Sequence, residues 1–290
     1  MSLVNGRWEG PVLDNHFHLD RGNRFTDAAL DFQRAGGTHL VLVHKPGAIP
    51  PVDISGYRSA YADTLDMAET VRRDLGLHVR VVLGPHPAVW AHQIDDLDVE
   101  RASELHLEAV ELAITHCEEG DAVGVGEVGR PHWEVDEVIW SAANDLFSEV
   151  LSMCSKAGVP VQLHLEGDGE PTYSDVAQMC DAAGMFRNDA IHHHAQADVS
   201  AAFTHGMTPS VLVGKGCVQT IVDTVASNQT GFLMETDYMD DPRRPGAVLG
   251  PKTVPKRTQA LATALIEAGE DAEEVLHRTH QDLPESLYAN

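Results

Sequence analysis

Short apolar runs alternate with longer amphipathic stretches along the whole chain. The apolar runs are typical of buried strands and cover residues 11–15, 38–44, 77–83, 122–126, 160–165, 189–193, 210–213 and 231–236. Apolar positions at helical spacing occupy residues 24–35, 55–75, 98–119, 135–157, 174–183, 199–204, 253–268 and 272–280. Glycines directly after several of these stretches, such as Gly76, Gly158 and Gly184, mark the expected helix ends.

Eight strand-like runs, each followed by helical periodicity, predict a (β/α)8 barrel in which residues 1–290 form one domain. A doubly wound open sheet is the main alternative fold. It is disfavoured because no Gly-x-Gly-x-x-Gly turn follows the first strand. The longest irregular segment, 240–254, lies just after the last strand, where a barrel would place an active-site loop.

The composition indicates a cytoplasmic protein that does not enter a membrane. The apolar runs are too short for a membrane span, and the N-terminus has no signal-peptide core. The four cysteines, Cys117, Cys154, Cys180 and Cys217, are widely separated and form no Cys-x-x-Cys pair. We therefore expect buried free thiols in a reducing compartment.

The charge balance is strongly acidic. Forty-five acidic residues oppose twenty basic ones, which gives a formal net charge of −25, and the acids are spread along the helical stretches. An acidic surface with few lysines suits a protein that stays soluble in concentrated salt, so we expect a halophilic source. The same charge disfavours broad binding to nucleic acids, because such binding rests on Lys and Arg neutralising phosphates.

Two histidines close the first strand in the pattern Asp-x-His-x-His at 14–18. Because alternate residues of a strand share a side, His16 and His18 present both imidazoles to one point, which suits a divalent metal. Other potential ligands stand where later apolar runs stop, namely Glu127, His164, one histidine of 192–194, and Asp237. Since the carboxyl ends of the strands share one face of a barrel, we expect these side chains to meet there.

Four imidazoles and two carboxylates exceed the three or four protein ligands of one metal ion and suit two cations about 3.5–4 Å apart. Glu127 is the expected bridge, because a carboxylate has two oxygens. Two cations lower the pKa of a bound water to roughly 7 and polarise the bond to be cleaved. Asp237 is expected to ligate one cation and to accept the proton of that water, and Glu235 is expected to point to the opposite side. The structural alternatives are a core histidine at 164 and an N-cap at 237.

These motifs together resemble the TatD-type metal-dependent hydrolases, which include deoxyribonucleases and belong to the amidohydrolase-like barrel superfamily. The resemblance rests on the segments 14–18, 84–87, 126–130 and 235–237 and on the strands that carry His164 and His193, and it is closest to an archaeal branch. It implies a first metal held by His16, His18, Glu127 and Asp237, and a second held by Glu127, His164 and His193. It also implies that His86 lies near the substrate phosphate; a rigid Gly-Pro-His-Pro loop is the alternative.

Two departures from the family pattern concern the substrate more than the metals. The family's Gly-Glu-x-Gly-Leu-Asp becomes Gly-Glu-Val-Gly-Arg-Pro, so Arg130 replaces an apolar residue and the following Asp is missing. Arg130 can bind an anionic substrate or form a salt bridge at the rim. The family's single histidine becomes the run 192–194, in which alternation places His192 and His194 on one side and His193 on the other. Comparison with the archaeal branch favours His193 as the ligand, and His192 is next.

Three functional hypotheses follow. The first is hydrolysis of phosphodiester bonds, as at DNA ends; the second is hydrolysis of small amides, cyclic amides or lactones; the third is a non-catalytic metal-binding scaffold. The expected cofactors are two divalent ions, with zinc, manganese, magnesium, iron and nickel all compatible with the donors. The expected partner is a small-molecule or nucleic-acid-end substrate, and no stable protein partner or oligomeric state is indicated.

Overall fold

The structure is a computed structural model that describes residues 2–241 and 248–289. Its main sheet contains eight strands in the spatial order β10-β9-β8-β7-β6-β5-β4-β3, and every neighbouring pair is parallel. The strands are β3 (Leu13–Phe17), β4 (His39–Val43), β5 (His78–Leu83), β6 (Gly124–Gly129), β7 (Val161–His164), β8 (Ala190–Ala195), β9 (Thr208–Leu212) and β10 (Leu233–Glu235). Each strand thus pairs with the next strand along the chain, as a barrel requires.

The first and last strands approach each other and nearly close the barrel. Phe17 pairs with Tyr238 in a parallel bridge, and the His18 N–H donates to the Tyr238 carbonyl at 2.9 Å. The buried Asp14 carboxylate accepts from the backbone N–H and the hydroxyl of Thr236 at 3.0 and 2.6 Å. The predicted (β/α)8 barrel is therefore confirmed.

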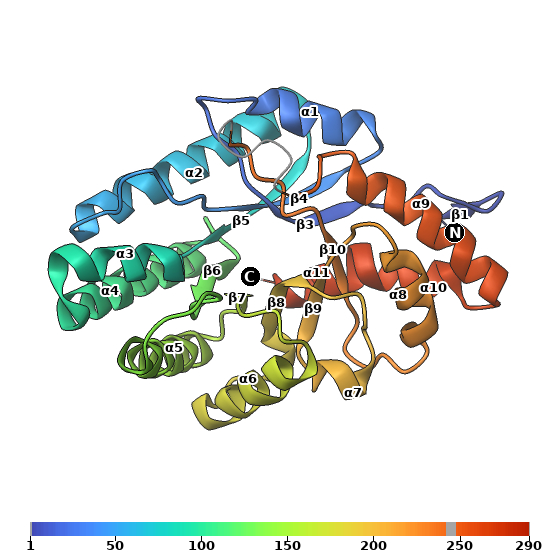
Figure 1. Cartoon of the computed structure of the whole chain (residues 1–290). Coiled ribbons are helices and arrows are strands. Elements are labelled where there is room, and N and C mark those ends of the chain that lie inside the picture. The colour runs from blue at the N-terminus through green and yellow to red at the C-terminus, as the bar shows by residue number, and fades with distance from the viewer. Residues whose placement is uncertain (1, 242–247, 290) are drawn as a thin grey trace.

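Helices surround the strands as an outer layer (Figure 1). They are α1 (Thr26–Arg34), α2 (Ile54–Leu75), α3 (Pro87–Leu97), α4 (Val99–Glu119), α5 (Glu137–Ala157), α6 (Glu170–Ala183), α7 (Ala201–Thr204), α8 (Cys217–Val225), α9 (Thr253–Ala268) and α10 (Ala272–His277). Their apolar faces bury residues such as Val110 of α4 and Leu151 of α5 in one cluster, and Ile221 of α8 and Leu261 of α9 in a second cluster. This amphipathic burial explains why helical spacing located most of them.

Three helices, α3, α8 and α11 (Leu283–Leu287), and a small hairpin were not predicted. Helix α3 begins at Pro87, where the Gly-Pro-His-Pro segment indicated only a turn. His86 caps this helix by accepting from the Ala88 N–H at 2.9 Å, and proline suits the first helical turn because it needs no donor there. Helix α8 follows β9, and the strands β1 (Leu3–Val4) and β2 (Arg7–Trp8) form an antiparallel hairpin.

The C-terminal segment closes the inside of the barrel. It comprises the π-helix η2 (Arg278–Asp282), helix α11 (Leu283–Leu287) and Tyr288, and in Figure 1 the C-terminus lies near the middle of the ring of strands. Leu287 and Tyr288 belong to the same buried cluster as Leu13 and Leu233, the first residues of β3 and β10. The segment therefore fills the barrel from the end opposite the carboxyl ends of the strands.

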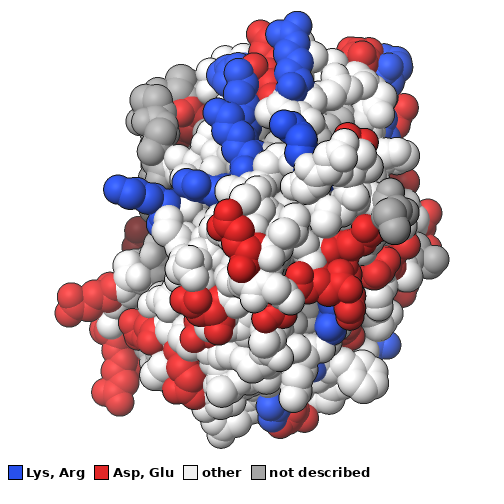
Figure 2. Space-filling view, turned by 90° about the vertical axis from the view of Figure 1, so that its right-hand side faces the viewer, with Lys and Arg blue, Asp and Glu red and all other residues white. Residues whose placement is uncertain are grey.

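The remaining expectations concern the surface, the thiols and the last loop. The acidic side chains are spread over the face in Figure 2, on which Lys and Arg gather in the upper part. All four cysteines are buried and free, as expected. Among the described helices, none is long and apolar enough to cross a membrane. Residues 242–247 of the predicted active-site loop 240–254 lie outside the described residues.

Candidate metal centre

Glu127 of β6 lies at the middle of a buried histidine cluster at the carboxyl ends of the strands. Its side chain is almost fully buried. Glu127 Oε1 is 3.4 Å from His16 Nε2 and 3.3 Å from His18 Nε2. Its other oxygen, Oε2, is 2.9 Å from His164 Nδ1 and 3.2 Å from His193 Nε2. One carboxylate thus faces two different pairs of imidazoles.

The two histidines of β3 are oriented by hydrogen bonds from their Nδ1 atoms to oxygen acceptors of the protein. His16 Nδ1 lies 2.8 Å from Gln162 Oε1, and His18 Nδ1 lies 3.0 Å from the Val43 carbonyl. Because a carbonyl oxygen only accepts, each Nδ1 carries the proton and each Nε2 lone pair points toward Glu127. Both rings are buried, so their orientation is fixed by these contacts.

The two histidines of β7 and β8 have different supports. His193 Nδ1 donates to Glu235 Oε1 at 3.1 Å, and Glu235 is itself fully buried. His164 Nε2 lies 2.6 Å from Nδ1 of His132, a residue in the loop after β6. A carboxylate behind a ligating histidine fixes its tautomer and raises its basicity. His193 is thus positioned by the barrel interior and His164 by a loop.

Asp237 lies directly beyond β10 at the edge of the same cluster. Its Oδ1 is 3.7 Å from His18 Nε2, and its Oδ2 is 3.2 Å from His194 Nδ1. Burial raises the pKa of this carboxyl, but the hydrogen bond from His194 and the charge of nearby histidines outweigh burial, so the net pKa is lowered. Asp237 is therefore ionised and able to bind a cation or accept a proton.

The electrostatics of Glu127 also favour the ionised form. Burial alone would raise its pKa, yet His86, His193 and His16 together hold the pKa of Glu127 well below its usual range. Conversely, Glu127 and Glu235 raise the pKa of His193 despite its burial. A buried carboxylate surrounded by imidazole nitrogens is a donor set that fits divalent metals.

Three groups of side chains each bring metal-ligating atoms within 4.8 Å of one another at this site. They are His16–His18–Glu127, His16–His193–Asp237 and His86–Glu127–His164. The first two groups contain only residues predicted as ligands. The third adds His86, whose Nε2 is 3.4 Å from Glu127 Oε2. The structure thus brings together all six predicted ligands and also the residue predicted to lie near the substrate phosphate.

Arg130 points into a different environment. Its guanidinium is almost fully buried, where it forms ion pairs with Glu166 and, at 2.7 Å, with Asp175. Nη1 also donates to Asn144 at 2.8 Å, and the guanidinium lies over the ring of Trp140. These contacts favour the salt-bridge alternative for Arg130 over contact with an anionic substrate.

The three consecutive histidines of β8 do not alternate as expected. His193 faces Glu127, whereas His192 is buried against Tyr173 with ring centroids 4.6 Å apart. His194 was expected on the side of His192, but its φ of 56° turns the chain, and its ring reaches Asp237. The register of β8 against β9 shifts between His192 and Ala195, which is why strict alternation fails here.

Four residues at the centre were not predicted from the sequence as site residues: His132, Gln162, His194 and Glu235. The expectation that Glu235 points away from the site was wrong. Positions two apart in a strand share a side, and this rule would have placed Glu235 with Asp237. Gln162 precedes His164 by the same interval in β7 and follows the same rule. His132 and His194 lie where no periodicity applies.

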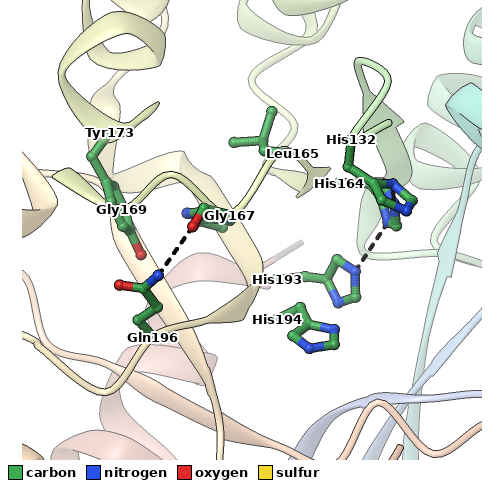
Figure 3. Close-up of a pocket in the computed structure, with 10 residues that line it drawn as sticks. His132, His164, Leu165, Gly167, Gly169, Tyr173, His193, His194 and Gln196 are labelled. Carbon is green, nitrogen blue, oxygen red and sulfur yellow. Dashed lines mark hydrogen bonds between the residues drawn. The ribbon is translucent and has the colours of Figure 1, made fainter. Parts of the chain in front are cut away.

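A cavity of about 260 Å³ opens beside His164 and His193. Figure 3 shows these two rings on one side of the cavity, with Tyr173 and Gln196 on the other. The cavity lies on the side of the cluster that carries the second pair of histidines. Two of the six predicted ligands, His164 and His193, therefore line the cavity directly.

Comparison with known proteins identifies relatives of the whole chain. A family model described as TatD related DNase matches residues 13–288. An uncharacterized protein of Methanocaldococcus jannaschii, MJ1127, is 31% identical over 282 residues, which cover 96% of this chain and 95% of the relative.

Solved structures share the fold at lower identity. YJJV, a TatD homologue from Escherichia coli, is 19% identical with a TM-score of 0.62, and the match covers 96% of this chain and 98% of that one. A mutant of a PTE-like lactonase from Deinococcus radiodurans is 11% identical with a TM-score of 0.59, covering 100% and 98%. At these identities the likeness shows the fold alone.

Proposed function

The chain belongs to the family of TatD related DNases and shares its metal-dependent hydrolase fold, and from this premise we propose that it hydrolyses phosphodiester bonds at a two-metal centre. The observation that supports the proposal is that the two carboxylate oxygens of Glu127 face different pairs of histidines. Oε1 faces His16 and His18, and Oε2 faces His164 and His193. A carboxylate placed in this way can bridge two cations.

Each side of the centre has its own donors under this proposal. His16, His18 and Asp237 would hold one cation with Glu127, and His164 and His193 would hold the other. Two divalent cations there would supply an activated water molecule and polarise the bond to be cleaved. Asp237, whose pKa is lowered and whose carboxylate contacts His194, would serve as the proton acceptor.

His86 contributes from the loop between β5 and α3. Its Nδ1 is occupied by the Ala88 N–H, so its Nε2 carries the proton and is directed to the site at 3.4 Å from Glu127 Oε2. A proton on Nε2 suits a hydrogen bond to a substrate oxygen such as that of a phosphate. We propose that His86 binds the substrate in this way, while Arg130 stabilises the loop through its ion pairs.

Hydrolysis of a small lactone or cyclic amide is the second candidate. It is favoured by the lining of the cavity, which contains no Lys or Arg among the described residues. A PTE-like lactonase also shares the fold. Cleavage of lactones, with single-stranded DNA left intact in the presence of Mg²⁺ or Mn²⁺, would select this candidate. A scaffold would bind metal and turn over neither substrate.

Metal content is the direct test of the two-metal centre. Protein purified in molar salt is compared with Glu127→Ala and with Glu149→Ala, an exposed acidic residue of α5 that serves as the matched control. We expect about two metals per chain in the unchanged protein and the control, and a sharp drop in Glu127→Ala. One metal or none, unaffected by Glu127→Ala, would show that Glu127 is not a bridge.

A further inference from the structure

The cavity beside His164 and His193 is small for a ligand pocket. Its volume of about 260 Å³ lies below the roughly 300–1,000 Å³ typical of pockets for drug-sized molecules. One wall is formed by β8 and the other by the segment that joins β7 to α6 and by Tyr173 of α6. A ligand in this space is therefore compact and lies directly against the histidines of the metal centre.

Two buried residues that line the cavity each carry a polar atom without a hydrogen-bond partner among the described residues. Tyr173 is 1% exposed and His192 is 6% exposed. Among the described residues, neither the Tyr173 hydroxyl nor His192 Nδ1 has a hydrogen-bond partner. Leaving a buried polar group unpaired costs free energy, so such groups indicate a ligand that completes them. Their rings lie 4.6 Å apart, so one small ligand can reach both.

The lining of the cavity is rich in flat rings and poor in acidic and basic side chains. None of the ten lining residues is Asp, Glu, Lys or Arg. His132 and His194 add further rings at the open side (Figure 3). Imidazole and phenol rings stack well on flat heterocycles.

We propose that this cavity receives a compact, uncharged, flat ring that carries hydrogen-bonding atoms and is joined to the bond that is hydrolysed. The Tyr173 hydroxyl and His192 Nδ1 pair with the polar edge of the ring. The inference deepens the proposed function and rests on it for the position of the scissile bond. With a phosphodiester substrate the ring is a nucleobase; with the second candidate it is the lactone or cyclic amide itself.

Binding of non-hydrolysed rings tests the cavity apart from catalysis. Thymidine, deoxyadenosine and 2-pyridone, a flat cyclic amide that resists hydrolysis, are titrated in molar salt into the unchanged protein, Tyr173→Phe and Tyr57→Phe. Tyr57 is a buried tyrosine of α2 that accepts from Gln93 and does not line the cavity, so it is the matched control. We expect at least one ring to bind, with its Kd raised about three- to tenfold in Tyr173→Phe and unchanged in Tyr57→Phe.

Thermal unfolding of the same variants adds a second readout. Tyr173→Phe should not lower the Tm, because its hydroxyl has no partner to lose within the described chain. Equal ring binding by Tyr173→Phe and the unchanged protein, or no binding of any ring, would overturn the inference. Binding of a nucleoside without cleavage of single-stranded DNA would reject the phosphodiester proposal and leave the cavity assignment standing.

Discussion

The two sides of the histidine cluster differ in how they are buried and supported. The His16 and His18 side chains are 0% and 1% exposed, whereas on the other side His193 is 3% exposed and His164 is 17% exposed. The first pair rests on Gln162 and a strand carbonyl, and His164 rests on His132 of a loop. One side is therefore built into the barrel interior, and the other forms the wall of a cavity.

This difference indicates that the two sides of Glu127 have different roles, one in metal binding and the other in substrate binding. A buried side with fixed ring orientations holds a cation tightly because little reorganisation accompanies binding. A side that borders a cavity can admit a substrate but gives its ligands more freedom. We therefore expect the buried side to dominate metal affinity and the cavity side to dominate substrate binding.

The largest expected effect is the loss of metal on replacing a ligand, and it should differ between the two sides. His16→Ala should abolish hydrolysis and reduce metal content, with a loss in metal affinity larger than the 10- to 100-fold typical of changes behind a ligand. His164→Ala should retain the metal of the buried side and lose the other. Metal content and hydrolysis measured on both variants check this order. Equal loss of both metals in His164→Ala would contradict the division.

A smaller effect is expected from the residues behind the ligands. Gln162→Leu removes the acceptor of His16 Nδ1, so metal affinity should fall by about 10- to 100-fold. His132→Ala removes only the loop contact of His164, and we expect a smaller loss of affinity together with a raised KM. Metal titration and steady-state kinetics measure the two values. A larger loss of affinity in His132→Ala would reverse the comparison.

The smallest effect is expected at the barrel end opposite the metal centre. Gln162 Nε2 donates to the Tyr288 hydroxyl at 2.9 Å, and that hydroxyl donates to Asn15 at 2.9 Å. Tyr288→Phe leaves these buried groups unpaired and should lower the free energy of unfolding by about 1–3 kcal/mol. Denaturant unfolding measures this change, and metal affinity should change less than in Gln162→Leu. An unchanged stability would show that the hydroxyl contributes nothing.

The sequence predicted the barrel and the ligand set for the same reason. Apolar runs mark strands, and parallel strands bring residues such as His16, Glu127 and Asp237 to one face. Helix α3 was not predicted because a proline such as Pro87 is common both in turns and in the first turn of a helix. Alternation places Gln162 on the side of His164 and Glu235 on the side of Asp237, but it does not indicate which atoms these two side chains contact. His194 was placed wrongly because a positive φ interrupts the alternation on which the placement relied.

Tyr288 is one of the last residues of this sequence to be synthesised, yet it contributes to the hydrogen bonds behind the first strand. Its hydrogen bond to Asn15 joins positions 273 residues apart. The Asn15 carbonyl also accepts a hydrogen bond from Gln162, the residue that supports His16. A chain that emerges from the ribosome with β3 first can pair His16 with Gln162 only after β7 has followed, and the last partner of Gln162 arrives with position 288. The hydrogen-bond network behind the first strand is therefore completed only when the barrel closes.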